Sequence, residues 1–494
     1  MTASERALES LHETATAIFQ DALQACSIES AFDRRLRFSG DGNEILTRLH
    51  TNGDGPATLN LKDFRSIYVV AIGKAAGPML DILLSRMKRR AGLRGICCST
   101  VVPEKKNWRI RYFEGGHPLP NEDSFAAARA TLALLRKARK DTLVLFLISG
   151  GSSAMFDLPL DEDILLDDTI AFHSVLIASG APITEINTVR KHFSAVKGGR
   201  LAEAAAEATK LSILLPDVPL RSLDMLASGP TCPDHSTREE VREILDRYQL
   251  LEKFSPTVRA YFERNEQPEQ DEKKGLLEGL RPHLPHISLP HVTLPWISSS
   301  EEDSPAEPTP AVADPFLNSF YEILLSSQDL VENAQVFAQQ AGFHAVIDNS
   351  CDDWDYAKAA HYLLERFHAL RAEHPRCCLI SGGEVTVTLN RTPGAGGRNM
   401  QFALACAIEL TPFAGQQLVV FSAGSDGIDG NTRAAGAIAD TATVPRAVTF
   451  GYHPAEELAA FNACPLFTSL GDTVVTGPTG HNLRDLRLLI SAAN

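Results

Sequence analysis

The sequence predicts an α/β protein built around a mostly parallel sheet. Segments with the apolar pattern of strands alternate with segments of helical spacing, which is the signature of such a sheet. Residues 143–148 form an unbroken apolar run of β-forming residues, as expected of a strand buried on both faces. At 494 residues the chain is too long for one ordinary core, so we expect two domains or more.

The run at 143–148 ends in a loop of small residues that suits a ligand site. Its glycines let the backbone turn tightly and approach a ligand, and successive free N–H groups can cradle an anion. Open α/β sheets usually place ligands at the carboxyl ends of such strands. An ordinary strand-to-helix turn explains the motif equally well. The loop consists of Ser149, Gly150, Gly151, Ser152 and Ser153.

A second loop of the same design follows the apolar residues 377–380. Two such loops, far apart in the sequence, suggest two lobes that face one cleft. The second loop consists of Ser381, Gly382, Gly383 and Glu384.

The composition favours a cytoplasmic protein without a nucleic-acid or membrane partner. The net charge of −15 disfavours a nucleic-acid surface, although a local basic pocket could still bind an anionic ligand. No run approaches the roughly 20 apolar residues that a membrane span requires. The acidic N-terminus resembles neither a signal peptide nor a transit peptide. The nine cysteines form no CxxC pair, so we interpret them as reduced thiols.

The chain opens with a predicted amphipathic helix over residues 4–25, where apolar residues recur at helical spacing. The first clear strand, residues 67–72, runs directly into Gly73 and Lys74. The glycine spacing does not match a Walker A loop. A lysine at a strand-to-helix turn is nevertheless well placed to meet a phosphate. The alternative is a solvated lysine in the first turn of a helix.

The most basic stretch is residues 187–201, which we predict to be helical up to a pair of glycines. On such a helix Arg190, Ser194 and Lys197 would share one face. A cationic row in an acidic protein could bind an anion, and the alternative is a plain solvated face.

Asp217 closely follows the next buried strand, residues 211–215. An aspartate at a strand end is placed for metal or base chemistry. Aspartate is also common in turns, so both interpretations stay open.

Residues 266–314 are rich in proline and charge, which indicates a flexible insertion or linker without a core of its own. We therefore expect an N-terminal domain over residues 1–265 and a C-terminal domain over residues 315–494. A strand at 320–325 would open the C-terminal domain.

The C-terminal domain carries a second set of candidates at two glycine-rich loops. The first loop delivers Arg398 to the start of a predicted helix, which suits bidentate contact with phosphate or carboxylate. Asp426 lies in the second loop, where it could serve a Mg²⁺-bound phosphate, because Mg²⁺ takes one or two carboxylates plus substrate oxygens. A plain glycine-rich turn is the alternative. The other candidates of the first loop are Gly396, Gly397 and Asn399.

Taken together, these segments resemble the glycerate 2-kinases of the MOFRL-containing family. Many separate motifs in one order are far more specific than any single motif, and they cover most of the chain outside 266–314. The motifs are residues 73–75, 116–120, 149–154, 187–200 and 217–231 in the first domain, and 381–401, 424–436, 477–480 and 482 in the second.

The resemblance implies a three-layer α/β domain followed by a C-terminal α/β MOFRL domain. It also implies ATP-dependent phosphorylation of D-glycerate at C2, giving 2-phosphoglycerate, with ATP and Mg²⁺ bound. Carried over by motif, the catalytic candidates are Lys74, Asp217, Arg398 and Asp426, and the two aspartates are also the candidate Mg²⁺ ligands.

These residue types suit phosphoryl transfer, which depends on positioning and cationic neutralisation more than on covalent chemistry. Lys74 and Arg398 would supply positive charge, and the two aspartates would hold Mg²⁺ or accept the hydroxyl proton. Arg190 and Lys197 are candidates for binding the carboxylate of glycerate or a phosphate. Which loop holds the nucleotide and which holds glycerate stays open.

Two other classes of function remain in view. A nicotinamide-dependent oxidoreductase would fit a doubly wound sheet, but no GxGxxG motif follows a strand. A non-catalytic sugar-phosphate-binding regulator could use the Ser-Gly-Gly loops, but the aspartate loops and Arg398 disfavour it. The chain could also form a homodimer.

Overall fold

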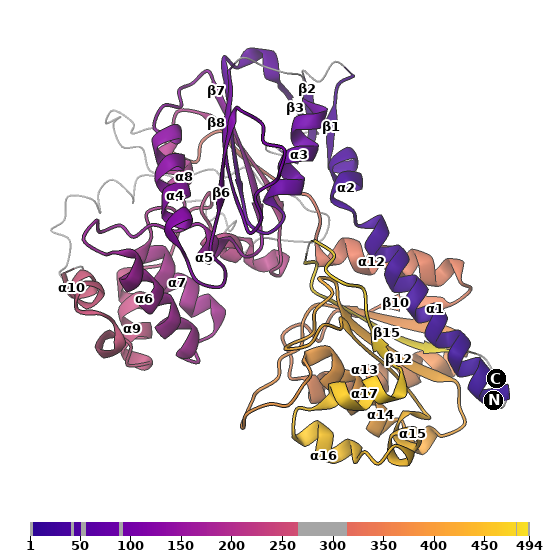
Figure 1. Ribbon diagram of the computed structural model, residues 1–494. Coiled ribbons are helices and arrows are strands. Elements are labelled where there is room, and N and C mark those ends of the chain that lie inside the picture. The colour runs from indigo at the N-terminus through magenta and orange to yellow at the C-terminus, as the bar shows by residue number, and fades with distance from the viewer. Residues whose placement is uncertain are drawn as a thin grey trace, which may run out of the picture. The chain divides into compact units, whose positions relative to one another are not determined.

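The computed structural model describes residues 3–40, 44–50, 56–87, 92–264, 314–480 and 482–492 and divides into two compact units (Figure 1). We call Ala31–Leu324 the central unit, and Met1–Ser30 together with Leu325–Asn494 the terminal unit. Each unit combines a six-stranded sheet with helices. The predicted α/β class is confirmed.

Six parallel strands form the main sheet of the central unit, in the order β6-β5-β4-β7-β8-β9. The central strand β7 is almost entirely apolar and every one of its residues is buried, as expected where both faces of the sheet are covered. The strands are β4 (Ser66–Ile72), β5 (Leu93–Ser99), β6 (Ile110–Glu114), β7 (Thr142–Ser149), β8 (Thr209–Leu215) and β9 (Ser319–Ile323).

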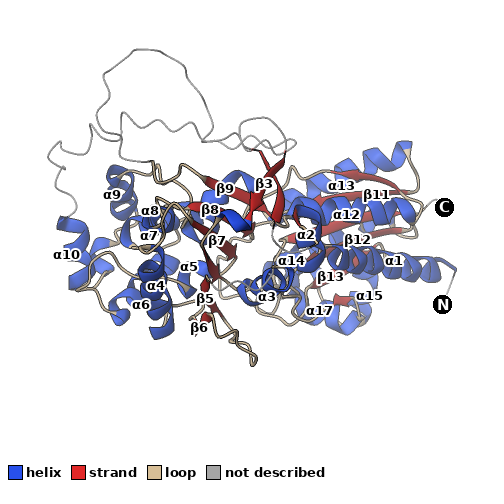
Figure 2. Cartoon of the chain, turned by 90° about the horizontal axis from the view of Figure 1, so that it is seen from above, coloured by secondary structure: helices blue, strands red, loops and turns tan. Residues whose placement is uncertain are grey.

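Helices α3 and α4 lie on opposite faces of this sheet and complete its three layers (Figures 1 and 2). The start of α4 is defined by Asn121, whose side chain accepts a hydrogen bond from the backbone N–H of Ser124. The apolar side of α4 then packs into the main core of the unit. The helices around the sheet are α3 (Ala76–Arg86), α4 (Glu122–Leu135), α5 (Ser152–Met155) and α8 (Arg200–Ala204).

The chain order of the strands reverses between β4 and β7. From β4 the sheet grows through β5 to β6, and from β7 it grows through β8 to β9 on the other side. In open parallel sheets, ligands bind outside the carboxyl ends of the strands at such a reversal. The loops that contain Lys74 and Gly150 start at this point.

Two smaller structures complete the central unit. One is a helical group around an aromatic core, in which Phe172 and Phe193 stack with ring centroids 4.0 Å apart. The other is an antiparallel sheet in the order β1-β2-β3. Their elements are α6 (Leu166–Ala178), α7 (Ile183–Phe193), α9 (Arg238–Arg247), α10 (Pro256–Arg264), β1 (Leu36–Phe38), β2 (Glu44–His50) and β3 (Pro56–Asn60), with α2 (Ile28–Arg35) leading into β1.

The terminal unit has a mixed sheet in the order β10-β11-β15-β12-β13-β14. Only β10 and β11 pair in parallel. The last strand along the described chain, β15, lies between β11 and β12 and runs antiparallel to both. The strands are β10 (His344–Ile347), β11 (Cys377–Gly382), β12 (Leu418–Gly424), β13 (Gly436–Asp440), β14 (Thr473–Val474) and β15 (Asp485–Ser491).

Helices α1 and α12 cover one face of this sheet, and α13 and α14 cover the other (Figure 1). The predicted opening helix is confirmed as α1, and its Phe19 ring lies 5.0 Å from the ring of Phe421 in β12. The helices are α1 (Ala3–Ala25), α12 (Ser327–Gln340), α13 (Tyr356–Glu373), α14 (Arg398–Glu409), α15 (Thr443–Thr449), α16 (Pro454–Ala459) and α17 (Ala463–Leu470).

The compact units do not follow the domain ranges expected from the sequence. Residues 1–30 belong with the C-terminal part of the chain, because the apolar face of α1 is buried there. The strand expected to open the second domain is β9, which instead pairs in parallel with β8 of the central unit. Apart from Asp314, the expected linker 266–314 lies outside the described residues.

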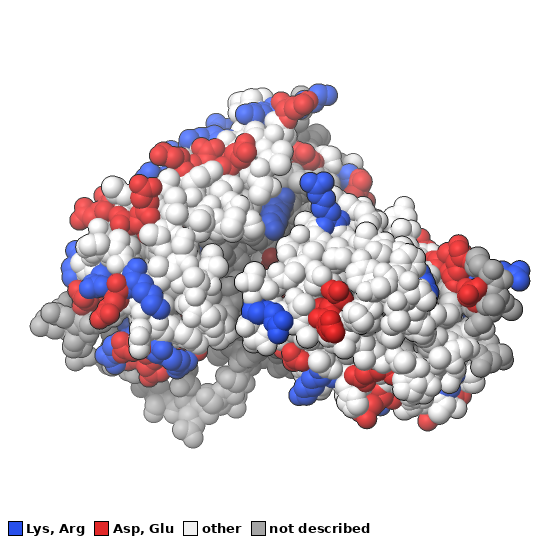
Figure 3. Space-filling view, turned by 60° about the horizontal axis from the view of Figure 1, so that its bottom comes forward, with Lys and Arg blue, Asp and Glu red and all other residues white. Residues whose placement is uncertain are grey.

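Among the described helices, none is both long enough and apolar enough to cross a membrane. On the face drawn in Figure 3, basic and acidic side chains are interspersed rather than gathered by sign. That face therefore lacks, in the described residues, the single-sign field that steers large polyanions.

Candidate functional site

In the central unit, the loops after β4 and β7 are joined by backbone and side-chain hydrogen bonds. The N–H of Lys74 donates to Gly150 O at 3.0 Å, and the N–H of Ala75 donates to Ser149 Oγ at 3.0 Å. Gly73 has a φ of +115°, and a Cβ there would overlap the Ser149 carbonyl. The two loops therefore hold the exposed Lys74 beside the Ser-Gly-Gly turn.

Asp217, which follows β8, approaches the same turn. A Cβ on Gly150 would overlap Asp217 Oδ2, so only glycine allows the carboxylate to come this close. The methylenes of the Lys74 side chain lie against Gly151 in the same way. The central unit thus brings together Lys74, the loop after β7 and Asp217, three separately predicted candidates that all follow strands of the parallel sheet.

Arg190 reaches this loop through a chain of polar side chains. Its Nη1 donates to Asn187 Oδ1 at 3.3 Å, and the Oγ of Ser228 donates to the same oxygen at 3.1 Å. Ser228 Oγ lies 3.2 Å from Ser153 Oγ. Arg190, a predicted site residue, is therefore connected to Ser153 at the end of the Ser-Gly-Gly loop.

Lys197 has a different role from the one expected. Helix α7 ends at Phe193, and Ser194 adopts an extended conformation, so Arg190, Ser194 and Lys197 do not share a helix face. The Nζ of Lys197 forms a 2.6 Å ion pair with Asp157, and both side chains are only 1% exposed. Its ammonium is committed to this internal carboxylate.

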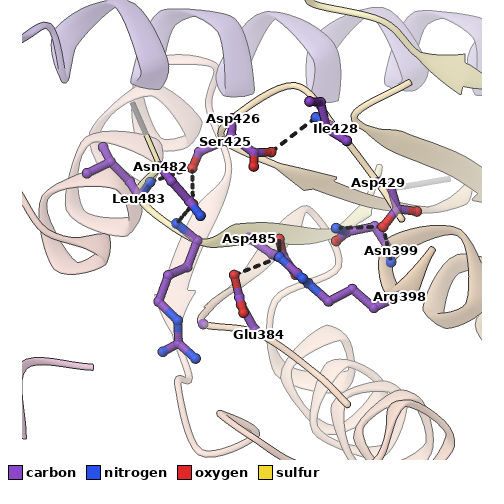
Figure 4. Close-up of polar contacts among 12 residues, drawn as sticks. Glu384, Arg398, Asn399, Ser425, Asp426, Ile428, Asp429, Asn482, Leu483 and Asp485 are labelled. Carbon is purple, nitrogen blue, oxygen red and sulfur yellow. Dashed lines mark hydrogen bonds and ion pairs between the residues drawn. The ribbon is translucent and has the colours of Figure 1, made fainter. Parts of the chain in front are cut away.

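In the terminal unit, Arg398 lies at the first position of α14 between two acidic side chains (Figure 4). Its Nε donates to Asp485 Oδ2 at 2.6 Å, and its Nη2 donates to Glu384 Oε1 at 2.6 Å. Asp485 is 0% exposed. Burial acts to raise the pKa of Asp485, but the Arg398 guanidinium holds it below its ordinary value. Arg398 and Glu384, both predicted, are thus brought together around the unpredicted Asp485.

The start of α14 already carries an anion from the protein itself. Asp429 Oδ1 and Oδ2 accept hydrogen bonds from the backbone N–H groups of Asn399 and Met400, at 3.0 and 2.9 Å. A Cβ on Gly397 would overlap Asp429, which explains the glycine at that position. Burial raises the pKa of Asp429 to about 6. Asp429 therefore caps the helix that carries Arg398.

Asp426, three residues before Asp429, is half-buried, and its Oδ1 accepts from the N–H of Ile428 at 3.1 Å. The loop is anchored by Ser425, whose Oγ accepts from the backbone N–H of Leu483 at 2.7 Å (Figure 4). In the described part of the chain, no three acidic, histidine or cysteine side chains converge as a metal cage. Mg²⁺ in phosphoryl-transfer sites does not need one, because it keeps substrate oxygens and water as ligands.

Sequence reasoning missed Asp485 for a geometric reason. The predicted candidates follow strands, which is where ligand-binding residues of a parallel sheet are expected. Because β15 is antiparallel to β11, its first residue lies at the edge where β11 ends. An aspartate immediately before the apolar run 486–490 was the available signal.

The structure adds His117 to the candidate site residues. It is exposed in the loop after β6, and partial burial together with the nearby Lys74 ammonium lowers its pKa. Its place near a candidate catalytic lysine was not visible in the sequence.

Comparison with known proteins gives two family matches along the chain. Residues 14–263 match a domain of unknown function, DUF4147, and residues 377–485 match the MOFRL family. A glycerate 2-kinase from Pyrococcus horikoshii is 31% identical over 429 residues, which cover 86% of this chain and 87% of the relative. A relative from Agrobacterium vitis with the provisional name hydroxypyruvate reductase is 32% identical, covering 85% of this chain and 86% of its own.

The fold comparison points the same way. The crystal structure of a glycerate kinase from Thermotoga maritima superposes with a TM-score of 0.72 and 28% identity, covering 98% of this chain and 100% of that one. The chain therefore belongs to the MOFRL-containing glycerate 2-kinase family.

Proposed function

We propose that the protein transfers the γ-phosphoryl group of ATP to the C2 hydroxyl of D-glycerate, giving 2-phosphoglycerate and ADP. The observation that carries this proposal is the meeting of Lys74, the Ser-Gly-Gly turn and Asp217 at the reversal point of the parallel sheet. A cation, a glycine turn that a phosphate can approach closely and a carboxylate are groups that suit phosphoryl transfer.

Each predicted catalytic residue has a distinct part in this proposal. Lys74 neutralises charge on the transferring phosphoryl group, since its side chain is exposed at the loop. Asp217 accepts the proton of the attacking hydroxyl or holds Mg²⁺. Arg398 offers a guanidinium whose side chain is 33% exposed, so it retains a face for phosphate or carboxylate beyond its two acidic partners.

Asp217 in the central unit and Asp426 in the terminal unit are each a candidate Mg²⁺ ligand. Gly150 has no side chain, so the Asp217 carboxylate can approach the turn closely. This arrangement fits a Mg²⁺ ligand, because a metal held by one carboxylate also needs room for substrate oxygens. When bound, Mg²⁺ neutralises charge on the ATP phosphates. The glycines and hydroxyls of both Ser-Gly-Gly loops remain candidates for phosphate contact.

The cytoplasmic location expected from the sequence belongs to the same proposal. Its support is that all nine cysteines are free thiols, eight of them buried, as is usual in a reducing compartment. The homodimer stays a prediction.

Hydroxypyruvate reduction is the second candidate, favoured by the name of the Agrobacterium vitis relative. The loop after β4 argues against it. A nicotinamide dinucleotide is usually held there by a GxGxxG turn, whereas this chain has Gly73 followed by Lys74. A lysine side chain at that point suits a kinase better.

One experiment separates the two candidates. The purified protein is incubated with MgATP and D-glycerate, and product is detected with enolase in the absence of phosphoglycerate mutase, because enolase consumes only the 2-phosphate isomer. A parallel reaction contains NADH or NADPH with hydroxypyruvate. We expect ADP and an enolase substrate in the first reaction and no cofactor oxidation in the second. The reverse result would replace the kinase by the reductase.

Lys74→Met provides the matched variant, since it keeps the length of the side chain and removes the charge. We expect turnover to fall by about 100- to 1000-fold, the usual effect of removing one preorganised electrostatic group. Thermal stability should be unchanged because Lys74 is exposed. Undiminished turnover would remove Lys74 from the catalytic set.

A further inference from the structure

Arg190 is a buried cation with most of its hydrogen-bonding capacity unused. The residue is 7% exposed. Its Nη1 donates to Asn187, while its Nε is buried without a hydrogen-bond partner among the described residues. A buried guanidinium with unsatisfied donors is costly unless a ligand supplies the missing acceptor.

The charges around Arg190 do not balance. Asp157 is the acidic group that acts on Arg190, but it already forms the 2.6 Å ion pair with Lys197. His173 and Ser194 also bind the two oxygens of Asp157. Burial lowers the pKa of His173, which favours the neutral ring, so His173 does not change this balance of charges. Among the residues that the structure describes, Arg190 and Lys197 therefore share the carboxylate of Asp157, which leaves one positive charge uncompensated there.

Hydrogen-bonded side chains connect Arg190 to the Ser-Gly-Gly loop. Asn187 Oδ1 is shared by Arg190 Nη1 and Ser228 Oγ, and Ser228 Oγ contacts Ser153 Oγ. Ala227 and Ser228 both have positive φ angles, 55° and 59°, which are rare for residues other than glycine. The backbone is thus held in an unfavourable conformation that turns the Ser228 hydroxyl toward this chain of side chains.

We propose that Arg190, oriented by Asn187, binds the carboxylate of the substrate beside Ser153 at the end of the Ser-Gly-Gly loop. A planar guanidinium with free donors matches the two oxygens of a carboxylate. A single uncompensated charge matches a monoanion, whereas the polyphosphate of ATP requires several cations or a metal. Lys197 takes no direct part, because its ammonium neutralises Asp157.

This assignment rests on the proposed function and names the specificity element of that site: the acceptor must be a hydroxy acid with an ionised carboxylate. Neutral polyols and the amide of glycerate would leave the buried guanidinium uncompensated. They are therefore excluded as good acceptors.

The test measures binding in the presence of MgCl₂ and a non-hydrolysable ATP analogue, so it does not depend on turnover. Calorimetry compares D-glycerate with its neutral amide in the wild-type protein and in Arg190→Gln. We expect Arg190→Gln to weaken D-glycerate binding by about 10- to 150-fold, the range for losing a hydrogen bond to a charged group. The affinity for the ATP analogue and for the amide should stay the same.

Arg200→Gln is the matched control, because the same substitution removes a guanidinium whose Nη1 is bound to the carbonyls of Lys191 and Lys197. We expect it to lower thermal stability and to leave D-glycerate affinity unchanged. Arg190→Gln should instead keep or raise the thermal midpoint of the ligand-free protein, since it removes an uncompensated buried charge. Arg190→Lys keeps the charge without the planar fork and should recover only part of the affinity.

Equal affinity of D-glycerate for the wild type and Arg190→Gln would overturn the subsite. A variant that loses stability and binds both D-glycerate and the ATP analogue more weakly would also overturn it, because that pattern indicates a structural role. Failure of the proposed function is a separate outcome: the wild type would then form no ADP in the enolase-coupled assay, whatever the binding data show.

Discussion

Arg398 lies between two carboxylates, so its removal should have two separable effects. Asp485 would lose its principal partner while remaining fully buried, which typically costs about 3–5 kcal/mol. The phosphoryl group would at the same time lose a cation. We therefore expect Arg398→Ala to lower both the thermal midpoint and the turnover number.

The double variant Arg398→Ala/Asp485→Asn distinguishes these effects. Neutralising Asp485 should restore most of the thermal midpoint, because no unpaired charge is left in the core. Turnover should stay low, by about 100-fold or more, since the cation is still missing. If turnover recovers together with stability, Arg398 acts only through the fold.

At the scale of elements, Asp429 connects the loop after β12 to the start of α14. It therefore positions Asp426, which precedes it, relative to Arg398, which opens the helix. Asp429→Asn retains the shape of the side chain but cannot accept from both backbone N–H groups. Because a displacement of about 1 Å can cost 100-fold in rate, we expect turnover to fall on that order while the protein stays folded.

Asp355→Asn is the control for this prediction. Asp355 caps α13 by accepting from the N–H groups of Ala357 and Lys358 with a single oxygen, Oδ1, which asparagine retains, whereas Asp429 uses both carboxylate oxygens. Because asparagine caps a helix about as well as aspartate, we expect little loss of stability and no change in turnover. Similar turnover losses in both variants would mean that Asp429 is only a helix cap.

A second prediction at this scale concerns Asp472 and Asp440, the two acidic residues that His12 of α1 contacts. Burial raises the pKa of Asp472 to about 6, with Asp440 adding to the shift and Arg446 and His12 opposing it. The folded protein then holds a proton that the unfolded chain releases near pH 4, so this group lowers stability as pH rises from about 4 to 6. As pH rises from 4.5 to 7, the thermal midpoint of the wild type should fall relative to that of Asp472→Asn.

Asp440 should show the opposite sign. Burial acts to raise its pKa, but His12 at 2.9 Å, the Ala442 N–H and Arg446 hold it below the ordinary value. Its stabilising contribution is present at neutral pH and is lost as pH falls. As pH rises through the range below about 4, the thermal midpoint of the wild type should therefore increase relative to that of Asp440→Asn, which is checked by extending the thermal melts to that range. Parallel pH profiles for the two variants would contradict both assignments.

The elements that the sequence predicted well are those whose own residues determine them. The buried strands β4, β7, β8 and β11 consist mostly of apolar, β-forming residues, which is the pattern of strands covered on both faces. The helix expected over 187–198 ends instead at Phe193, because Ser194 and Lys197 turn to the buried Asp157. That partner lies 37 residues from Ser194, and no local pattern records it.

The same limit applied to the candidate site. Lys74, Gly150 and Asp217 could be grouped in advance because all three follow parallel strands, whose carboxyl ends share one edge. Asp485 could not be grouped with Arg398, because this required knowing that β15 is antiparallel. Pairing direction depends on the whole sheet rather than on the residues of one strand.

At the scale of the whole molecule, α1 shows why domain boundaries were harder to predict than elements. Its apolar spacing identifies a helix with one buried face but does not identify what covers that face. The DUF4147 match begins inside α1, at residue 14, and continues to residue 263, whereas the helix packs in the terminal unit. A sequence family and a compact unit need not share boundaries when the chain returns to an earlier sheet.

Phe19→Ala tests this assignment of α1. Phe19 is fully buried against Phe421, and the loss of a buried phenylalanine typically costs about 3–5 kcal/mol. Hydrogen exchange resolved by segment should accelerate in β12 and α12 of the terminal unit and stay unchanged in β4 and β7. Gln24→Ala, at an exposed position of the same helix, should change neither. Faster exchange in β4 and β7 would show that α1 packs in the central unit instead.

The position of β15 has a consequence for how the protein is made. During synthesis β11 and β12 emerge long before residues 485–491, yet these two strands do not pair with each other and must await the strand that lies between them. Until the ribosome has reached residues 485–491, each presents an open edge that can recruit other chains. A nascent chain that stops early also lacks Asp485, so the partner of Arg398 arrives with the strand that closes the sheet. Premature termination should therefore yield aggregation-prone fragments for proteolysis rather than a partly active kinase.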